Sequence, residues 1–135
     1  MMYQHIVIVG RLGADPEMRY TPSGAPVTTF RVATNRRYTD SEGNSHDETT
    51  WFRVTAWRRL AETCNQYLAK GRLVLVDGRL NPDESGNPRI WTGKDGVARA
   101  SYELTATAVK FLSPRGEPVA EVGLGEELPE EEIPF

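Results

Sequence analysis

The stretch Thr50-Trp51-Phe52-Arg53-Val54-Thr55-Ala56-Trp57 decides the fold, because its residues alternate with the two-residue period of a β-strand. Successive side chains of a strand point to opposite faces. One face, which we expect to pack in a core, holds Phe52, Val54 and Ala56. The other face holds Trp51, Arg53, Thr55 and Trp57. The stretch therefore predicts a half-buried strand whose second face displays two tryptophans around an arginine.

Large exposed aromatic side chains on one face of a strand usually meet a partner. At about 3.3 Å per residue, Trp51 and Trp57 lie about 20 Å apart, which is enough for several unstacked bases rather than one small ligand. Flat rings stack on bases and arginine pairs with phosphates, so this face has the chemistry of a single-stranded nucleic-acid platform. The alternative is a strand buried on both faces, because tryptophan is more often packed than displayed.

The length and composition indicate one domain. A chain of 135 residues is large enough for one apolar core and too small for two. The single cysteine, Cys64, excludes an internal disulfide and lies in a helical pattern, where a buried thiol is expected. The first five residues contain neither a basic segment nor a long apolar run. We therefore expect no secretory signal, no membrane span and a cytoplasmic protein.

The net charge of −3 divides unevenly along the chain. Residues 1–112 hold 15 Lys and Arg against 12 Asp and Glu, a net charge of +3, whereas residues 113–135 hold one Arg against seven Glu, a net charge of −6. The acidity therefore belongs to the C-terminal segment. Thirteen of the 16 cationic residues are Arg, which suits stacking and bidentate phosphate contacts, although arginine usage can equally reflect genome composition.

Hydrophobic periodicity and turn residues predict five strands and one helix. We expect the strands at residues 6–9, ended by Gly10, and at 27–35, 49–57, 72–78 and 102–111. The unbroken apolar run at 73–76 predicts burial on both faces. The helix is expected at residues 58–70, with Gly71 as its stop and an apolar stripe of Leu60, Cys64, Tyr67 and Leu68. Residues 81–88 are dense in turn formers and predict an extended hairpin tip.

Arg36, Arg37 and Tyr38 continue the second strand beyond residue 35. They repeat the aromatic and basic composition of the strand at 49–57, which follows after a polar loop. We therefore expect the two strands to contribute to one shared face. The alternative for Arg36 and Arg37 alone is a solvated strand end.

The order strand, strand, strand, helix, strand, strand predicts the fold class. One helix between the third and fourth strands of a small β-domain rich in Gly and Pro turns matches an all-β, five-stranded Greek-key barrel, the OB-fold. The second and third strands of this barrel form its usual oligonucleotide face. The strand at 49–57 is the third, which agrees with the interpretation of its tryptophans.

The segment after residue 112 has few aromatic residues, no periodicity and high acidic charge, so we expect a disordered acidic C-terminal tail. We divide the chain into an OB-fold domain at 1–112, a flexible linker at 113–129 and an acidic tip at 130–135. The tip consists of Glu130, Glu131, Glu132, Ile133, Pro134 and Phe135. Carboxylates followed by apolar residues suit docking into a basic-rimmed apolar pocket of a partner protein. The alternative is a tail that only increases solubility.

Nine segments carry a family pattern, and they lie at residues 9–13, 15–17, 19–24, 33–35, 50–54, 60–62, 67–68, 70–71 and 78–80. With these segments the sequence resembles the bacterial-type single-stranded DNA-binding proteins over essentially its full length. The tip is similar to the family's ending of three aspartates followed by Ile-Pro-Phe, with glutamate in place of aspartate. Residues 81–88 are longer than the usual family hairpin, and the linker is shorter than in many relatives.

The resemblance implies sequence-independent binding and protection of single-stranded DNA during replication, recombination and repair. It implies a homotetramer whose N-terminal strand, at residues 2–9, helps form a dimer interface, and whose acidic tips recruit partner proteins in the bacterial cytoplasm at the nucleoid. The family's DNA-stacking aromatics fall on Tyr38, Trp51, Trp57 and Trp91. Its basic DNA contacts fall on Arg53, Arg59 and Lys70. Positive charge without a family counterpart is added by Arg36, Arg37 and Arg58.

Two other function classes are weighed against DNA binding. An OB-fold protein that chiefly assembles a primosome or an RNA-binding complex is the first, and an equal preference for RNA would favour it. An enzyme is the second, but His5 and His46 lie in different contexts and no phosphate-cradling loop or nucleophile motif is present. Paired loop acids lack the convergent ligands of a metal site. We therefore expect no catalysis, no metal and no cofactor.

Overall fold

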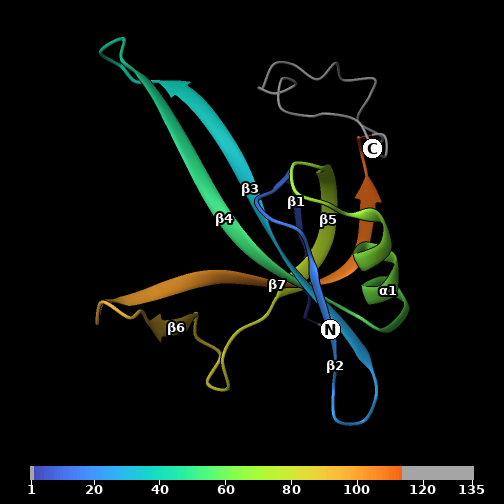
Figure 1. The fold of residues 1–135 in the computed structure, drawn as a ribbon. Coiled ribbons are helices and arrows are strands. Elements are labelled where there is room, and N and C mark those ends of the chain that lie inside the picture. Colours follow the sequence, from blue (N-terminus) through green and yellow to red (C-terminus); the bar gives the residue numbers. More distant parts are fainter. Residues whose placement is uncertain (1, 114–135) are drawn as a thin grey trace.

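A computed structural model describes residues 2–113 of the chain, and Figure 1 shows two hairpins that project from a barrel, with one helix beside it. The strands are β1 (Ile6–Leu12), β2 (Glu17–Tyr20), β3 (Pro26–Thr39), β4 (Ser45–Trp57), β5 (Leu73–Leu80), β6 (Arg89–Thr92) and β7 (Ala98–Phe111). The helix is α1 (Arg58–Tyr67). No helix within the described range is long and apolar enough to span a membrane. The predicted acidic tip and nearly all of the linker lie outside the described residues.

Five of the strands close a barrel in the order β1-β5-β7-β4-β3, and β3 returns to β1. β4 and β7 pair in parallel, and the other neighbouring strands of the barrel pair antiparallel. Closure removes the open edges that a small sheet would otherwise expose. The prediction of an all-β, five-stranded OB-fold barrel with one short helix between its third and fourth strands is confirmed.

Burial along β4 follows the predicted alternation. Val54 and Ala56 are fully buried, whereas Trp51 and Trp57 are 42% and 45% exposed. The alternative of a strand buried on both faces is therefore wrong for β4. It is correct for β5, where all residues from Leu73 to Val76 are buried, as the unbroken apolar run predicts.

The helix α1 ends three residues earlier than predicted, at Tyr67. Leu68 has extended backbone angles, its N–H donates to the carbonyl oxygen of Cys64 (2.9 Å), and its side chain is buried in the core. Gly71, the predicted stop, has a φ of +87° in the following turn, where its N–H bonds to the carbonyl oxygen of Leu12. The helix therefore ends at Tyr67, while Leu68 keeps the core position that the apolar stripe predicts. Cys64 is buried as predicted, and burial raises the pKa of its thiol to about 12.

Gly10 does not end β1, which continues to Leu12. The strand begins its pairing with β3 at the next residue, where Arg11 lies opposite Ala33. A Cβ atom at Gly10 would lie 2.1 Å from the carbonyl oxygen of Ala33. This glycine is therefore a position of close backbone approach inside a strand.

Two short strands, β2 and β6, add to the predicted five, and β4 and β7 begin earlier than predicted, at Ser45 and Ala98. Most of these additions belong to the projecting hairpins, where cross-strand pairing holds the strands together. The residues that they add are largely exposed on both faces. They therefore lack the alternation of apolar and polar residues on which strand prediction depends.

The hairpins of this sheet share one turn design. Residues 21–25, 40–44 and 93–97 each carry glycine at the fourth position with φ between +80° and +92°. In each turn the first N–H bonds to the fifth carbonyl and the glycine N–H bonds to the first carbonyl. A tight turn that ends in a left-handed residue matches the right-handed twist of a hairpin, and only glycine adopts this conformation without strain.

Residues 81–88 contain the predicted turn, because the N–H of Asp83 bonds to the carbonyl oxygen of Asn87 and that of Gly86 to the carbonyl oxygen of Asp83. The turn is not the tip of a hairpin between two paired strands, however. The residues on either side, Leu80 and Arg89, both pair with β7, so β5 and β6 form one interrupted strand along β7. The tip of this longer hairpin lies at residues 93–97. Residues 82–88 leave the interrupted strand sideways, and we call them the side loop.

Replacing Gly10 by alanine should destabilise the barrel, because the new Cβ atom would meet a backbone oxygen that no side-chain rotation can move. We expect the free energy of unfolding to fall by about 3 kcal/mol, at the upper end of the usual cost of overpacking. Urea denaturation followed by circular dichroism measures the change. Gly43→Asn is the control, because Gly43 has open space around it and asparagine tolerates its φ of +89°. An equal fall in the free energy of unfolding in Gly10→Ala and Gly43→Asn would contradict the close backbone approach at Gly10 as the cause.

Candidate nucleic-acid interface

The two projecting hairpins diverge from the short parallel pairing of β4 and β7. This pairing runs from Phe52 opposite Tyr102 to Thr55 opposite Thr105. On the N-terminal side of Phe52 and Tyr102 the strands separate, β4 into the β3–β4 hairpin and β7 into the β6–β7 hairpin (Figure 1). An open groove of about 890 Å³ lies between them, and we call it the fork groove.

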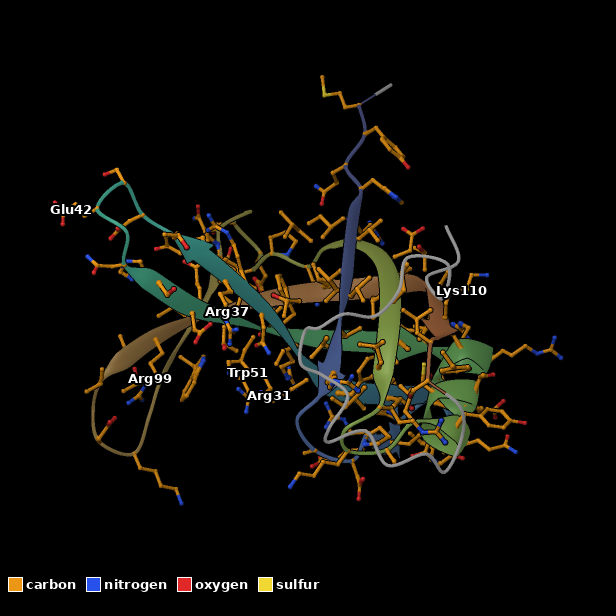
Figure 2. All side chains as sticks on the ribbon, turned by 90° about the horizontal axis from the view of Figure 1, so that it is seen from above. Arg31, Arg37, Glu42, Trp51, Arg99 and Lys110 are labelled. Carbon is orange, nitrogen blue, oxygen red and sulfur yellow. The ribbon has the colours of Figure 1, made fainter. Side chains whose placement is uncertain are left out.

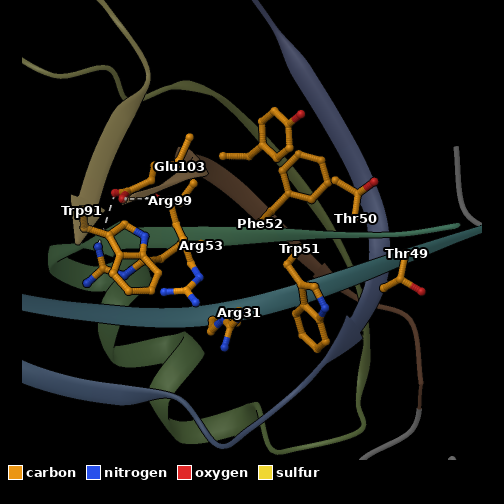
Figure 3. A pocket seen from close by; sticks show the side chains of 12 residues that line it. Arg31, Thr49, Thr50, Trp51, Phe52, Arg53, Trp91, Arg99 and Glu103 are labelled. Carbon is orange, nitrogen blue, oxygen red and sulfur yellow. Dashed lines mark hydrogen bonds and ion pairs between the residues drawn. The ribbon is translucent and has the colours of Figure 1, made fainter. Parts of the chain in front are cut away.

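Two tryptophans stand at opposite ends of the fork groove, Trp51 on β4 and Trp91 on β6 (Figure 3). Trp51 is 42% exposed and Trp91 is 50% exposed, so each indole is anchored but offers ring surface to a ligand. The Trp51 ring lies across Gly13, where a Cβ atom would come within 2.6 Å of two ring carbons. The missing side chain at Gly13 therefore makes room for the Trp51 ring.

Three arginines, Arg31, Arg53 and Arg99, also line the fork groove (Figures 2 and 3). The guanidinium carbon of Arg31 lies 4.8 Å from the centroid of the Trp51 ring, and that of Arg99 lies 5.5 Å from the Trp91 ring. Arg31 is directly opposite Arg53 in the β3–β4 ladder. These cation–π contacts hold positive charge beside flat aromatic surface, which suits both parts of a nucleotide.

Arg31 and Arg99 were not among the predicted DNA-binding residues. A signal for Arg31 was present, because alternation along β3 places it on the face away from the buried Phe30. Arg99 follows the turn at 93–97 in a segment without a periodic pattern. Its role depends on its place opposite Trp91 in the β6–β7 ladder, which composition alone does not indicate.

Arg53 joins the fork groove to a second groove. Its Nη1 donates to Oε1 of Glu103 (3.3 Å), and Nε of Arg89 lies 3.8 Å from the same oxygen. The second groove, of about 400 Å³, shares Arg53 and Glu103 with the first and contains Trp57 and Tyr20. The two grooves therefore form one continuous track along the surface. Tyr20, 61% exposed on β2, is a further aromatic residue that the sequence analysis missed.

Tyr38 lies on the opposite face of the β3–β4 hairpin from Trp51, so the predicted shared face is wrong for this residue. The ladder pairs Tyr38 with His46, and positions an odd number of residues from Trp51 on β4 point away from its face. The Tyr38 ring stacks on His46 with centroids 5.0 Å apart, and the guanidinium carbon of Arg36 lies 4.5 Å from its centroid. Tyr38 is therefore separate from the track and already has two partners.

Arg36 and Arg37 each pair with a carboxylate across the hairpin. Nη1 of Arg36 lies 3.1 Å from Oε1 of Glu48, and Nε of Arg37 lies 2.9 Å from Oδ1 of Asp47. Both pairs are exposed, and such pairs contribute about 0 to 1 kcal/mol, so a phosphate can compete with these carboxylates. The register places Arg37 on the face of Trp51 and Arg36 on the other face.

The remaining predicted basic residues, Arg58, Arg59 and Lys70, lie outside both grooves. Arg58 and Arg59 line a shallow hollow beside residues 23–26. Within residues 2–113 none of these three side chains takes part in an ion pair. The backbone N–H of Lys70 is held by Oδ1 of Asp15 (2.9 Å). These residues add positive charge around the track without forming part of it.

Two carboxyl groups in the turns of the projecting hairpins have lowered pKa values. His46 and the N–H groups of its turn lower the pKa of Asp40. Arg99 and a backbone N–H lower the pKa of Asp95, which thereby stays charged and holds Arg99 beside Trp91. Among the residues that the structure describes, no group of three or more His, Cys, Asp or Glu side chains is placed to hold a metal ion.

Gly13→Ala should displace the Trp51 ring, because the new methyl group would occupy the space of two ring carbons. We expect a changed near-ultraviolet circular dichroism spectrum and stronger acrylamide quenching, with the free energy of unfolding within about 1 kcal/mol of the wild type. The matched control introduces the same change into a Trp51→Phe background, where acrylamide quenching should no longer respond. Identical spectra of the wild type and Gly13→Ala would show that the ring does not depend on this glycine.

Single-stranded DNA-binding proteins of two bacteria resemble this chain over most of its length. The single-stranded DNA-binding protein of Neisseria meningitidis is 40% identical over 117 residues, which cover 87% of this chain and 64% of that protein. The single-stranded DNA-binding protein of Thermotoga maritima is 40% identical over 132 residues, which cover 97% of this chain and 89% of that protein. The match with the Neisseria protein therefore spans slightly less than two thirds of that relative's length.

Solved structures also resemble this chain over most of its length. The small single-stranded DNA-binding protein from Streptomyces coelicolor has a TM-score of 0.66 and 33% identity, over 82% of this chain and 95% of that chain. The Plasmodium falciparum SSB in complex with single-stranded DNA has a TM-score of 0.67 and 26% identity, over 84% of this chain and 97% of that chain.

The family match covers the whole folded part of the molecule. It extends over residues 3–112, which include every strand of the barrel, the helix and both grooves. Sequence identity, fold and the aromatic and basic character of the grooves agree with one another. The chain belongs to the single-strand binding protein family.

Proposed function

We propose that this protein binds and protects single-stranded DNA without sequence preference. The observation that carries the proposal is the continuous track in which Trp91, Trp51 and Trp57 alternate with Arg31 and Arg53. Exposed ring faces suit unstacked bases, and guanidinium groups between them suit the phosphates that connect the bases. Family membership and the resemblance to an SSB bound to single-stranded DNA support the same function.

Binding proceeds by electrostatic capture and then stacking. Each stacked base contributes about 1 to 3 kcal/mol, and each phosphate contact releases counterions, so affinity falls with salt with a slope of about 0.7 per contact. The carboxylate partners of Arg36 and Arg37 are exposed and give way to phosphates. Duplex DNA hides its base faces and binds far more weakly.

The proposed site comprises the residues of the track together with predicted contacts around it. Trp51, Trp57, Trp91 and Arg53 form its centre. Tyr38, Arg36 and Arg37 extend it along the β3–β4 hairpin, where a strand that passes round the hairpin meets the Tyr38 ring. Further phosphate contacts are made by Arg58, Arg59 and Lys70. Arg31 and Arg99 join the site because they stack on its tryptophans.

The proposed organisation is an OB-fold domain at residues 1–112, a linker at 113–129 and a protein-interaction tip at 130–135. Through the tip the protein recruits replication, recombination and repair proteins in the bacterial cytoplasm, at the nucleoid. The assembly is a homotetramer. In support, β1 has no partner along one edge from residue 6 to 10 within the described range, and Val7 within this stretch is 47% exposed. An unpaired apolar edge is a template for a strand of a second copy.

Titration with a long oligo-thymidine strand tests the proposed function. We expect strong quenching of tryptophan fluorescence, a negative salt dependence, and weak responses to a matched duplex and a matched RNA. Trp51→Ala and Trp91→Ala should each weaken binding by about 1 to 3 kcal/mol, or about 5- to 150-fold. Ile90→Ala is the matched control, because Ile90 is 69% exposed beside Trp91 but points to the other face of β6. Unchanged fluorescence and no binding by the wild type would refute the proposal.

The acidic tail competes with DNA for the basic track at low salt. Removal of residues 126–135 deletes five glutamates, so it should tighten binding to oligo-thymidine most at the lowest salt concentration and little at high salt. Affinities measured at several salt concentrations for the full chain and the truncated chain test this. Equal affinities at every salt concentration would exclude the competition.

A further inference from the structure

The side loop at residues 82–88 encloses a hollow of its own against β7. The hollow has a volume of about 400 Å³ and is lined mainly by apolar atoms. Its apolar residues are Leu80, Pro82, Pro88, Ala100 and Tyr102. Tyr102 is 60% exposed and its ring packs at an angle on Phe52, with centroids 5.6 Å apart. The hollow therefore presents a flat aromatic side chain and two proline rings to whatever enters it.

The side loop is held in place by hydrogen bonds. Oδ1 of Asp83 accepts the backbone N–H groups of Ser85 and Asn87 (2.9 Å each), which closes the turn. Arg89 donates from Nη2 to the carbonyl oxygen of Pro82 (3.0 Å) and from Nε to that of Asn81 (3.3 Å), which secures the base of the loop. The walls of the hollow are therefore built before any ligand arrives.

The hollow adjoins the track at the point where the two grooves meet. It shares the four residues 100–103 with the fork groove, and it shares Asn81, Arg89 and Glu103 with the second groove. Glu103 lines all three. The mouth of the hollow therefore borders both grooves, and Tyr102 reaches it from the face of β7 that Phe52 shares rather than from the face of Glu103.

The charges at this mouth favour a base over a phosphate. The only cation that lines the hollow, among the described residues, is Arg89, and its guanidinium is engaged by two carbonyl oxygens and by Glu103. The Glu103 side chain is only 9% exposed and cannot turn away into solvent. Glu103 and the two guanidinium groups that flank it are already paired with one another. The wall of the hollow is mainly apolar and carries a tyrosine, which suits an uncharged nucleobase better than a phosphate.

The geometry points to a nucleobase subsite in this hollow: a nucleotide that crosses between the two grooves turns its base under the side loop, against Tyr102 and the prolines. This inference rests on the proposed function and adds to the track a stacking position beyond the four predicted aromatics. It also assigns a role to the side loop.

The sharpest test removes the side loop and leaves the sheet intact. Leu80 lies opposite Leu104, the N–H of Asn81 bonds to the carbonyl oxygen of Glu103, and Arg89 lies opposite Ser101. One residue between Asn81 and Arg89 is therefore enough to continue the ladder opposite Tyr102. Replacing residues 82–88 by a single threonine should give a folded protein with an uninterrupted strand and no hollow.

A point variant provides a second, independent test. Leu80→Asn removes apolar surface from the hollow but not from either groove, because Leu80 lines the hollow and lines neither of the two grooves. Val97→Asn is the matched control, since Val97 is 50% exposed, compared with 46% for Leu80, and lies at the far tip of the same hairpin, outside the hollow and both grooves. Circular dichroism confirms that each variant is folded.

The measurement compares an end-labelled oligo-thymidine with an abasic strand of the same length at low salt, by fluorescence anisotropy with the full chain. For a base subsite, the loop replacement weakens oligo-thymidine binding about fivefold or more and Leu80→Asn weakens it about threefold. Binding of the abasic strand and the salt slope stay unchanged, and Val97→Asn matches the wild type.

Three outcomes would overturn the inference. A loss of binding to both strands with a salt slope reduced by about 0.7 would mean that the loop contacts a phosphate. Wild-type affinity for both strands with an altered sedimentation coefficient of the loop-replacement variant would mean that the hollow receives a second copy of this chain. Wild-type behaviour in every assay would mean that the hollow has no ligand. Failure of the unmodified protein to bind oligo-thymidine would refute the proposed function as well. Normal binding by the unmodified protein together with any of the three outcomes above would refute the base subsite alone.

Discussion

The parallel contact between β4 and β7 covers only four residue pairs, and both its presence and its shortness shape the molecule. It closes the barrel around Val54 and Leu104, which lie opposite one another and are fully buried. If the pairing continued one step further, Trp51 would lie opposite Ser101 and backbone would fill the fork groove. The barrel thus has a closed core on one side of Phe52 and an open fork on the other.

Positive charge in the grooves is held in place before a ligand arrives. Arg53 is paired with Glu103, Arg99 with Asp95, and Arg31 lies over the Trp51 ring. Such contacts limit the side-chain freedom that binding would otherwise remove. Except for Glu103, the partner groups are exposed, so a phosphate replaces them at a cost of about 0 to 1 kcal/mol. The groove arginines are therefore ordered by contacts with neighbouring side chains, and most of these contacts are weak enough for a ligand to replace.

Local patterns in the sequence were enough for the barrel and for part of the site. Alternation over residues 50–57 correctly predicted which side chains of β4 are buried, and the apolar run of β5 correctly predicted burial on both faces. The helix boundary, the end of β1 and the course of residues 81–88 were wrong. Each of these segments makes contacts with distant residues, such as the carbonyl oxygen of Leu12 for Gly71 or the backbone of β3 for Gly10.

The sequence by itself determined the class of fold, the exposed tryptophans of β4 and the separation of a basic domain from an acidic tail, because these follow from periodicity and composition within short windows. Only the tertiary structure decided which arginines meet which rings, that Tyr38 faces away from Trp51, and that a side loop encloses a hollow. These features depend on strand register, and register joins residues such as Arg53 and Glu103, which lie 50 positions apart. A shift of one residue would turn every side chain of a strand to the other face.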